Sequence, residues 1–238
     1  MPETVRVLQT PPADDCALKR DYFDRYWISR DYVKTDRRTM ERAQLVWSHL
    51  ARRRGKALDT GCGRGLLASF LAEQGLEVDA TDISPQAVVL TAQRGVNTFV
   101  LDLERQTPLG WYDVVLCLEV LQQVRDPEDV LRRLSGVLAD DGELVISVPN
   151  EFHLWRRLCV LAGRVDFGGV EDTHLKFFTP QRAVELAAGC GLEIRKRVYT
   201  SILPPGFGPL SVLGKAAARL WPAGVALSTL LFLRKAAP

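Results

Sequence analysis

The stretch Lys56-Ala57-Leu58-Asp59-Thr60-Gly61-Cys62-Gly63-Arg64-Gly65 is a short apolar run that ends in a glycine-rich loop. Apolar residues then recur at helical spacing from Leu66 to Gln74. Glycines after a strand let the backbone turn sharply and approach a ligand, and the first amides of the following helix point at that ligand. This stretch therefore predicts the first strand, the ligand-binding loop and the first core helix of an α/β fold.

The alternation of strand and helix continues along the chain. Ser84-Pro85 has the N-cap and first-turn residues of the next helix, Pro127–Leu138 is expected to be a later helix, and Asp140-Asp141-Gly142 is expected to be a turn. Such alternation predicts a mostly parallel sheet with helices on both faces, a three-layer α/β sandwich that binds its ligand at the carboxyl ends of the strands. The expected strands are Lys56–Asp59, Leu76–Ala80, Thr98–Leu101, Tyr112–Leu116, Leu144–Val148, Leu192–Tyr199 and Val225–Arg234.

The parts outside this core divide the chain further. We expect a domain boundary near residue 40, with a tail and two covering helices in residues 1–40 and the main domain in 41–238. Residues 1–15 are predicted to form a loose tail. Residues 150–178 are predicted to be a lid-like insertion after the fifth strand. The helices expected outside the core are two between Cys16 and Ser48, then Leu154–Leu161, Thr179–Ala188 and Leu210–Leu220.

Three aspartates stand at the ends of the first three strands. Asp59 precedes the glycine loop, Asp82 ends the second strand, and Asp102 ends the third. A carboxylate in the first place suits an ammonium group, one in the second can accept both ribose hydroxyl protons, and one in the third can accept from an adenine amino group. Each aspartate alone is typical of a turn or cap. Together they favour a nucleoside that carries an amino-acid tail.

A dinucleotide is the main alternative ligand for such a loop. That class of protein has the pattern GxGxxG, whereas this chain has GxGxG with Leu66 in the place of the last glycine. Asp59 would also repel a pyrophosphate. Both features disfavour an NAD-dependent dehydrogenase.

Charge and composition place few further limits on function. The chain has 238 residues and a net charge of +2, which gives no global attraction to nucleic acid or to membranes. Arg37-Arg38 and Arg52-Arg53-Arg54 are expected to lie on solvated helix faces, and a patch that binds an anionic substrate or a partner is the alternative. Five cysteines without CxxC spacing argue against a disulfide framework and fit a cytoplasmic protein. The most apolar stretch, Val225–Leu233, is too short to span a bilayer and is expected to be a buried strand.

At this point the motifs resemble those of class I methyltransferases that depend on S-adenosylmethionine. The glycine loop resembles their first motif, Asp82-Ile83-Ser84-Pro85 their second, and Leu101-Asp102-Leu103 their adenine-contacting segment. Residues 112–121 and 142–150 resemble their later strand motifs. The resemblance implies a Rossmann-like sheet of seven strands with the last one antiparallel. It also implies S-adenosylmethionine as cofactor, a small-molecule acceptor and these cofactor-binding residues: Tyr26, Asp59, Thr60, Gly61, Cys62, Gly63, Gly65, Asp82, Ile83, Asp102, Leu103, Leu118 and Glu119.

Two local resemblances refine this expectation. Residues 94–97, 121–128, 149–150 and 153–158 resemble the MetW family of methionine-biosynthesis proteins, which implies an accessory role beside a homoserine acyltransferase. Ubiquinone-type O-methyltransferases carry Glu-His, a metal-holding pair, where this chain has Gln122-Gln123. Because the glutamine amide is neutral, we predict no catalytic metal. A second copy of the chain and an acyltransferase are both left open as protein partners.

Methyl transfer requires a positioned acceptor and, where the acceptor must lose a proton, a general base. His174, near the end of the lid-like range, is the candidate base, although a histidine that caps a turn remains the alternative. His153, within the lid-like segment, has less support. Tyr22, Tyr26 and Trp27 form an aromatic stripe that is either ordinary packing or a cover over the cofactor. Cys62 is expected to pack within the loop rather than to act as a nucleophile.

Three functions remain from the sequence. The first is an enzyme that methylates an O, N or C atom of a small molecule. The second is a MetW-like accessory protein, and the third is the disfavoured dehydrogenase. The sequence does not specify the methyl acceptor.

Overall fold

The computed structural model describes residues 6–7, 14–29, 32–164, 174–201 and 209–236. The chain divides into two compact units. The first contains Met1–Cys117 and Arg133–Leu144, and the second contains Leu118–Arg132 and Val145–Pro238. Strands β5 (Tyr112–Leu118) and β6 (Leu138–Pro149) each begin in the first unit and end in the second.

The strands form one mixed sheet in the order β1-β4-β3-β2-β5-β6-β8-β7. Four neighbouring pairs are parallel, namely β1 with β4, β4 with β3, β3 with β2, and β2 with β5. Strands β7 and β8 pair antiparallel. The expected α/β fold with seven core strands and an antiparallel last strand is confirmed. The remaining strands are β1 (Arg6–Val7), β2 (Lys56–Thr60), β3 (Glu77–Asp82), β4 (Asn97–Val100), β7 (Leu192–Ser201) and β8 (Ala226–Lys235).

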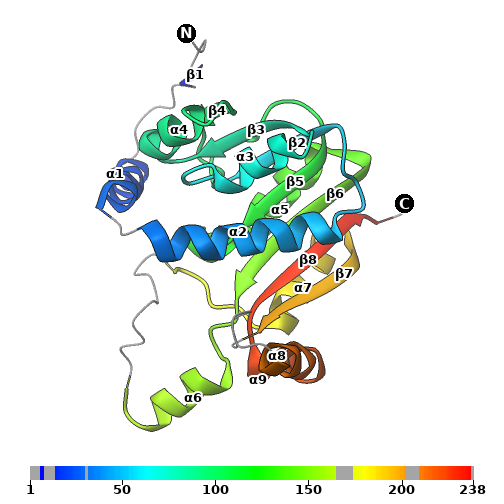
Figure 1. Cartoon of the computed structure of the whole chain (residues 1–238). Helices are drawn as coiled ribbons and strands as arrows, with labels where there is room; N and C mark the ends of the chain where they lie inside the picture. The colour runs from blue at the N-terminus through cyan, green and yellow to red at the C-terminus, as the bar shows by residue number, and fades with distance from the viewer. Residues whose placement is uncertain (1–5, 8–13, 30–31, 165–173, 202–208, 237–238) are drawn as a thin grey trace. The chain divides into compact units, whose positions relative to one another are not determined.

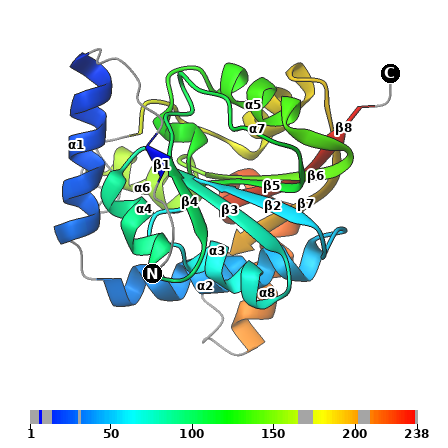
Figure 2. The same cartoon turned by 90° about the horizontal axis from the view of Figure 1, so that it is seen from above.

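The core of the first unit lies on its parallel strands. Leu58 of β2 and Val115 and Leu116 of β5 are completely buried, as expected for strands that are covered on both faces. Helix α2 lies along α3 (Figure 1), and α1 packs against α4 (Figure 2). The helices of this unit are α1 (Asp14–Ser29), α2 (Tyr32–His49), α3 (Leu66–Glu73) and α4 (Pro85–Ala92).

The structure differs from the sequence expectation at both ends of this unit. Arg6 and Val7, expected in a loose tail, form strand β1 beside β4. Strand β6 begins at Leu138 rather than Leu144, so that Asp140–Gly142 lies within the strand and not in a separate turn. Leu138 is fully buried, and its burial extends the strand toward the preceding helix.

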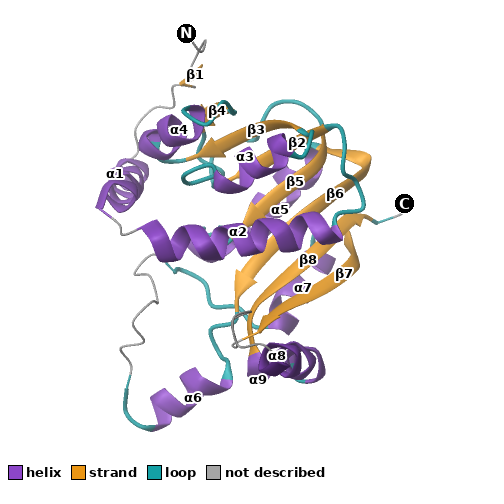
Figure 3. Ribbon diagram, in the orientation of Figure 1, coloured by secondary structure: helices purple, strands orange, loops and turns teal. Residues whose placement is uncertain are grey.

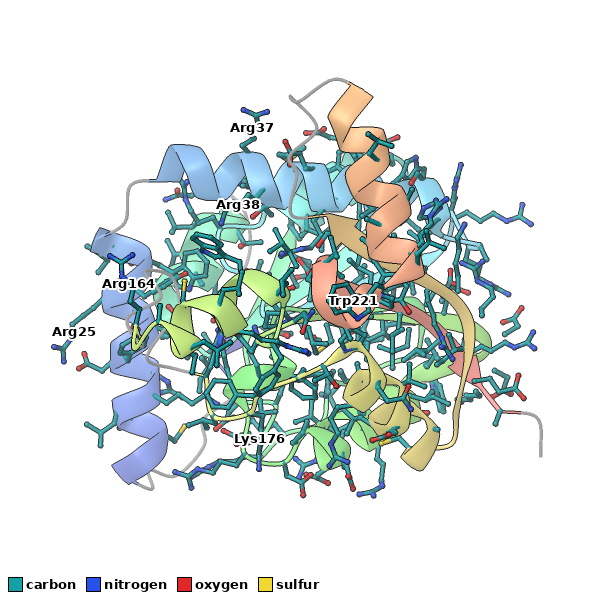
Figure 4. The ribbon with its side chains drawn as sticks, turned by 90° about the horizontal axis from the view of Figure 1, so that it is seen from below. Arg25, Arg37, Arg38, Arg164, Lys176 and Trp221 are labelled. Carbon is teal, nitrogen blue, oxygen red and sulfur yellow. The ribbon has the colours of Figure 1, made fainter. Side chains whose placement is uncertain are left out.

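The arginine-rich segments also differ from each other. Arg37 and Arg38 lie on α2 with exposed side chains, and Arg37 points away from the ribbon (Figure 4). Arg37 pairs with Glu41 one turn later, as on a solvated helix face. Arg52, expected on a helix, follows the end of α2 and instead binds Asp113 and Asp141.

The second unit is organised by the antiparallel pair β7 and β8. Residues Leu230 to Leu233 of β8 are completely buried, which confirms the expected buried strand at this position. Helix α7 packs against both strands and α8 packs against β7 (Figure 3). Within the described residues, no helix is both long and apolar enough to cross a membrane. The helical elements of this unit are η1 (Leu121–Gln123), α6 (Leu154–Leu161), α7 (Pro180–Gly189), α8 (Pro209–Leu220) and α9 (Pro222–Val225). Helix α5 (Pro127–Gly136) begins in the second unit and ends in the first.

Asn150, directly after β6, ties together the end of the second unit. Its main-chain N–H donates to the carbonyl of Leu227 at 2.8 Å. Its side-chain Nδ2 lies 2.9, 3.2 and 3.3 Å from the carbonyl oxygens of Ala226, Ala223 and Pro222. The side chain is buried, so these carbonyls have little water to replace it.

Replacing this amide tests its structural role. Asn150→Ala should lower the free energy of unfolding by about 1–3 kcal/mol, because buried carbonyls lose their donor. Gln181→Ala on the exposed surface of α7 is the control and should change stability by less than about 0.5 kcal/mol. Urea denaturation of both variants measures the difference. Equal stability of the two variants would contradict the role given to Asn150.

Candidate functional site

The glycine loop between β2 and α3 requires its glycines. Gly61, Gly63 and Gly65 have φ angles of 71°, 55° and 73°, a region that L side chains rarely adopt. The main-chain amides of Gly61 and Cys62 donate to the carbonyl of Thr81 at 2.7 and 3.0 Å. The loop is therefore attached to the neighbouring strand β3 and held in a fixed shape.

Two buried carboxyl groups lie at this loop. Asp59 is buried at the end of β2, and burial followed by the nearby charge of Asp82 raises its pKa to about 8. Burial also raises the pKa of Asp82, to about 6, although hydrogen bonds from the amides of Ser84 and Gly63 oppose the increase. Those amides lie 2.9 and 3.0 Å from the two Asp82 oxygens. Burial thus makes it costly to ionise either carboxyl group, and a cationic ligand would favour their charged forms.

Asp102 stands after β4 and is buried like the other two aspartates. Its Oδ1 accepts from the amide of Glu104 at 3.0 Å, and its Oδ2 accepts from the thiol of Cys16 at 3.2 Å. Lys19, one turn after Cys16, binds Glu104 at 2.6 Å. Helix α1 is therefore attached to the carboxyl end of β4. The use of Asp102 for an adenine group stays a prediction.

Helix α1 makes a second attachment at the start of α4. Asp24 accepts hydrogen bonds from the Ser84 hydroxyl and, at 3.1 Å, from the amide of Gln86. Ser84 in turn caps α4 by accepting from the amide of Ala87 at 3.1 Å. These contacts fix the helix that carries the aromatic stripe.

Trp27 is the member of that stripe that contacts the glycine loop. A Cβ atom on Gly63 would come within 2.6 Å of the Trp27 indole. The indole Nε1 is buried, and no group among the described residues hydrogen-bonds it. Tyr26 packs edge-on against Trp27, with 4.9 Å between ring centroids. Sequence reasoning named Tyr26 as the cofactor contact and left Trp27 outside the predicted site, although both were in the stripe.

Thr91 of α4 was also missed from the sequence. Its hydroxyl donates to the carbonyl of Gly63 at 3.1 Å and lies 3.4 Å from the Cys62 thiol. A Cβ on Gly65 would come within 2.6 Å of its methyl group. Burial raises the pKa of Cys62 well above its ordinary value, which fits a packed thiol and not a nucleophile. Nothing in the local sequence around Thr91 signals this contact.

In the second unit, Glu119 directly follows β5 and has a left-handed backbone conformation, which is unusual for a non-glycine residue. Among the described residues it is the one non-glycine with positive φ, at 59°. Its amide and its Oε1 both meet the buried hydroxyl of Ser147, at 3.1 and 2.8 Å. Strain of this kind is commonly kept at functional positions. The predicted roles of Glu119 and of its neighbour Leu118 in cofactor binding remain predictions.

Gln122 is buried beside the segment that carries the candidate base. Its carbonyl accepts from the amides of Leu175 and Lys176 at 2.8 and 3.0 Å. Its side-chain Oε1 is buried without a hydrogen-bond partner in the described part of the chain. No cluster of three or more metal-ligating side chains occurs among those residues. The prediction that catalysis needs no metal stays a prediction.

His174 belongs to a buried cluster that is centred on Glu151, two residues after the end of β6. Its Nδ1 is 2.9 Å from Oε1 of Glu151, and Oε2 of Glu151 binds the guanidinium of Arg156. The three side chains are 9%, 5% and 16% exposed. Among the described residues, the Nδ1 of His153 has no hydrogen-bond partner, so its ring is not joined to this cluster through that atom. Burial lowers the pKa of His153. The structure thus distinguishes the two candidate histidines and adds Glu151, which the sequence did not single out.

Comparison with known families gives one match that covers most of the chain. A family model described as a methyltransferase domain matches residues 32–197. The chain belongs to this family. The matched range includes the glycine loop and the three aspartates, but not α1.

The ubiquinone biosynthesis O-methyltransferases are relatives of known sequence. That of Marinobacter nauticus is 29% identical over 154 residues, which cover 59% of this chain and 65% of that protein. That of Rickettsia canadensis is 31% identical over 148 residues, which cover 58% and 63%. The chain therefore spans less than two thirds of the length of each of these two relatives.

Solved structures share the fold. A possible histamine N-methyltransferase from Thermotoga maritima superposes with a TM-score of 0.66 and 17% identity, over 92% of this chain and 98% of that one. The magnesium protoporphyrin IX methyltransferase of Synechocystis, with bound SAH, superposes with a TM-score of 0.64 and 20% identity, over 92% of this chain and 99% of that one. At such identities the likeness shows the Rossmann-like methyltransferase fold alone.

The residues of the first unit fit S-adenosylmethionine. Asp59 would offer a buried carboxylate to its ammonium group, and Asp82 has lone pairs, beyond those used by the two amides, that could accept from ribose hydroxyls. The loop glycines allow close approach of the backbone. The buried Trp27 Nε1 is an additional donor at the loop. Family membership and these groups together assign S-adenosylmethionine as the cofactor.

The contact between Gly63 and Trp27 provides one test. Gly63→Ala should weaken S-adenosylmethionine binding by more than about tenfold. The backbone at this position has a positive φ that alanine rarely adopts, and the new Cβ would displace the Trp27 indole from the loop. Gly95→Ala is the matched control, since Gly95 also has positive φ (79°) but no atom within 4 Å of its Cβ position. Isothermal calorimetry gives both affinities. Equal affinities in the two variants would refute the role of this contact.

Asp59 provides a second test, because its replacement should increase the stability of the protein and weaken cofactor binding. Its folded pKa of about 8 exceeds the unfolded value, so its contribution to stability is greatest below about pH 4 and is lost as the pH rises through 8. Asp59→Asn should therefore raise the free energy of unfolding of the ligand-free protein, by about 1–3 kcal/mol at pH 7. Urea denaturation measures it.

The same substitution should weaken S-adenosylmethionine binding. In the wild type, affinity should rise between pH 6 and 7.5 by up to about tenfold per unit, because Asp59 must lose its proton to meet the ammonium group. Asp59→Asn should remove that dependence. Asp79→Asn is the control: Asp79 is buried but bound to Tyr112, Asn97 and Lys56, so its loss should destabilise the fold. A less stable Asp59→Asn protein would count against this account.

Proposed function

We propose that this chain transfers a methyl group from S-adenosylmethionine to a hydroxyl oxygen of a small molecule. The buried pair of His174 and Glu151 is the observation that carries the choice of a hydroxyl acceptor. A hydroxyl must lose its proton during transfer, and a histidine fixed by a carboxylate is a suitable group to accept it. The names of the relatives, which are O-methyltransferases, support the same acceptor atom.

The residues of the first unit would hold the cofactor. Asp59 would bind its ammonium group, Asp82 its ribose hydroxyls and Asp102 its adenine. When bound, S-adenosylmethionine supplies an electrophilic methyl carbon. Trp27 covers the glycine loop and would exclude water from it. In the second unit, Glu119 and Ser147 are fixed to each other by a hydrogen bond, and the predicted cofactor contact of Glu119 is part of this proposal.

The second unit would serve the acceptor. His174 would take the proton from the acceptor hydroxyl, and the unpartnered Oε1 of buried Gln122 would accept a hydrogen bond from the same molecule. Gln122 is neutral, so this arrangement requires no cation between the protein and the acceptor oxygen. Lid residues Leu154, Trp155, Leu158 and Leu161 of α6 have exposed apolar side chains, which would suit an acceptor with apolar parts.

Substitution of His174 tests the reaction. His174→Gln should lower kcat by about 10²–10⁴, because the hydroxyl proton loses its acceptor, with little change in the affinity for S-adenosylmethionine. Transfer of labelled methyl groups to 3,4-dihydroxybenzoate and to the small-molecule fraction of a cell extract measures the rate. His49→Gln, on α2 of the first unit, is the control and should remain active.

Two outcomes would contradict the proposal. Full activity of His174→Gln would remove this histidine as the base. Tight cofactor binding without transfer to any acceptor, together with capture of an acyltransferase, would favour the MetW-like accessory role instead. The predicted protein partners and the domain boundary near residue 40 remain proposals.

A further inference from the structure

Glu151 occupies a position where its backbone cannot move freely. It follows Asn150, whose side chain and amide bind the α9 and β8 region. Its own amide donates to the carbonyl of Phe178 at 3.2 Å. The carboxylate is therefore presented from a segment that is held on both sides, and its side chain is 5% exposed.

Each oxygen of this carboxylate has a different partner. Oε1 lies 2.9 Å from Nδ1 of His174, and Oε2 binds Arg156. A buried carboxylate needs compensation of its charge, and Arg156 provides a permanent positive charge for it. Arg156 therefore stabilises Glu151 in the ionised form, in which both oxygens can only accept hydrogen bonds.

This chemistry determines which nitrogen of His174 carries the proton. Because Oε1 can only accept, Nδ1 must donate, and in the neutral ring the lone pair then lies on Nε2. We propose that Glu151 is a positioning residue that fixes His174 in the Nδ1–H tautomer, so that Nε2 is the atom that takes the acceptor proton. The proposal rests on the proposed function for its catalytic consequence, but not for the tautomer itself.

A purely structural ion pair is the competing explanation. In that case Glu151 and Arg156 would only join the segment after β6 to α6, and the protonation of the His174 ring would not depend on them. Stability alone does not separate the two explanations, since both predict a loss when the buried pair is broken. A measurement on the imidazole ring separates them.

The chain is well suited to that measurement because it has three histidines, His49, His153 and His174. In the full-length protein with ¹⁵N-labelled histidine, NMR distinguishes a protonated ring nitrogen from an unprotonated one. His174→Gln assigns the His174 signals by their loss. The wild type should show a protonated Nδ1 and an unprotonated Nε2 at His174 at neutral pH.

Glu151→Gln should reverse this tautomer. Arg156 can only donate, so the new amide oxygen should turn toward it and leave the amide NH₂ group facing Nδ1 of His174. Nδ1 must then accept, which moves the ring proton to Nε2. Glu151→Asp keeps a carboxylate and should retain the wild-type tautomer. Glu193→Gln, which alters an exposed pair with Arg234, is the matched control and should leave the spectrum unchanged.

The rate of methyl transfer gives the second readout. With 3,4-dihydroxybenzoate as the acceptor probe, Glu151→Gln should lower kcat by about 10²–10⁴, because Nε2 no longer has a lone pair for the proton, and S-adenosylmethionine affinity should stay constant. Glu151→Asp should recover part of the rate.

The outcomes separate the two proposals. An unchanged His174 tautomer in Glu151→Gln, or a wild-type ring protonated on Nε2, would overturn the role of Glu151 and leave methyl transfer intact. Absence of transfer by the wild type to any hydroxyl would count against the proposed function, whereas the spectrum would still decide how Glu151 acts on the ring. If Glu151→Gln does not fold, the spectra of the wild type and of Glu151→Asp decide the same question.

Discussion

The unneutralised carboxyl group of Asp59 is the constraint around which the first unit is arranged. Burial raises its pKa to about 8, and the second buried carboxyl group, Asp82, adds to the effect. A fold does not gain stability from such a group, because ionisation inside the protein is costly. The cost is understandable where a cationic ligand completes the charge balance, which is the situation that an ammonium group creates.

The rest of the loop serves to keep this carboxyl group in place. Gly61 and Cys62 are attached to β3 through the carbonyl of Thr81, and Thr91 of α4 holds the carbonyl of Gly63. Helix α1, attached through Asp24, brings Trp27 onto the same loop. The loop is thus held by the sheet, by α4 and by α1.

Sequence patterns were sufficient where a residue's role follows from local geometry. Glycines with positive φ, the Ser84 cap and the apolar strands were all predictable, and so were the places of Asp59, Asp82 and Asp102. Contacts between segments distant in the chain were not. Thr91 and Glu151 have no local signature, because their importance arises from neighbours 28 and 23 residues away. The early start of β6 was missed because Asp140 and Asp141 resemble turn residues.

The buried carboxyl groups of the two units have different surroundings, and this difference indicates different functions. In the first unit, within the described part of the chain, no ion pair joins Asp59 or Asp82 to a cationic side chain, and burial raises the pKa of both. A cationic ligand would therefore favour their ionised forms. In the second unit Glu151 already has Arg156 and His174 as partners. A carboxylate that is compensated within the protein attracts no cation, but it can orient a neighbouring ring. The first arrangement is therefore suited to binding a charged cofactor, and the second to controlling the position of a proton.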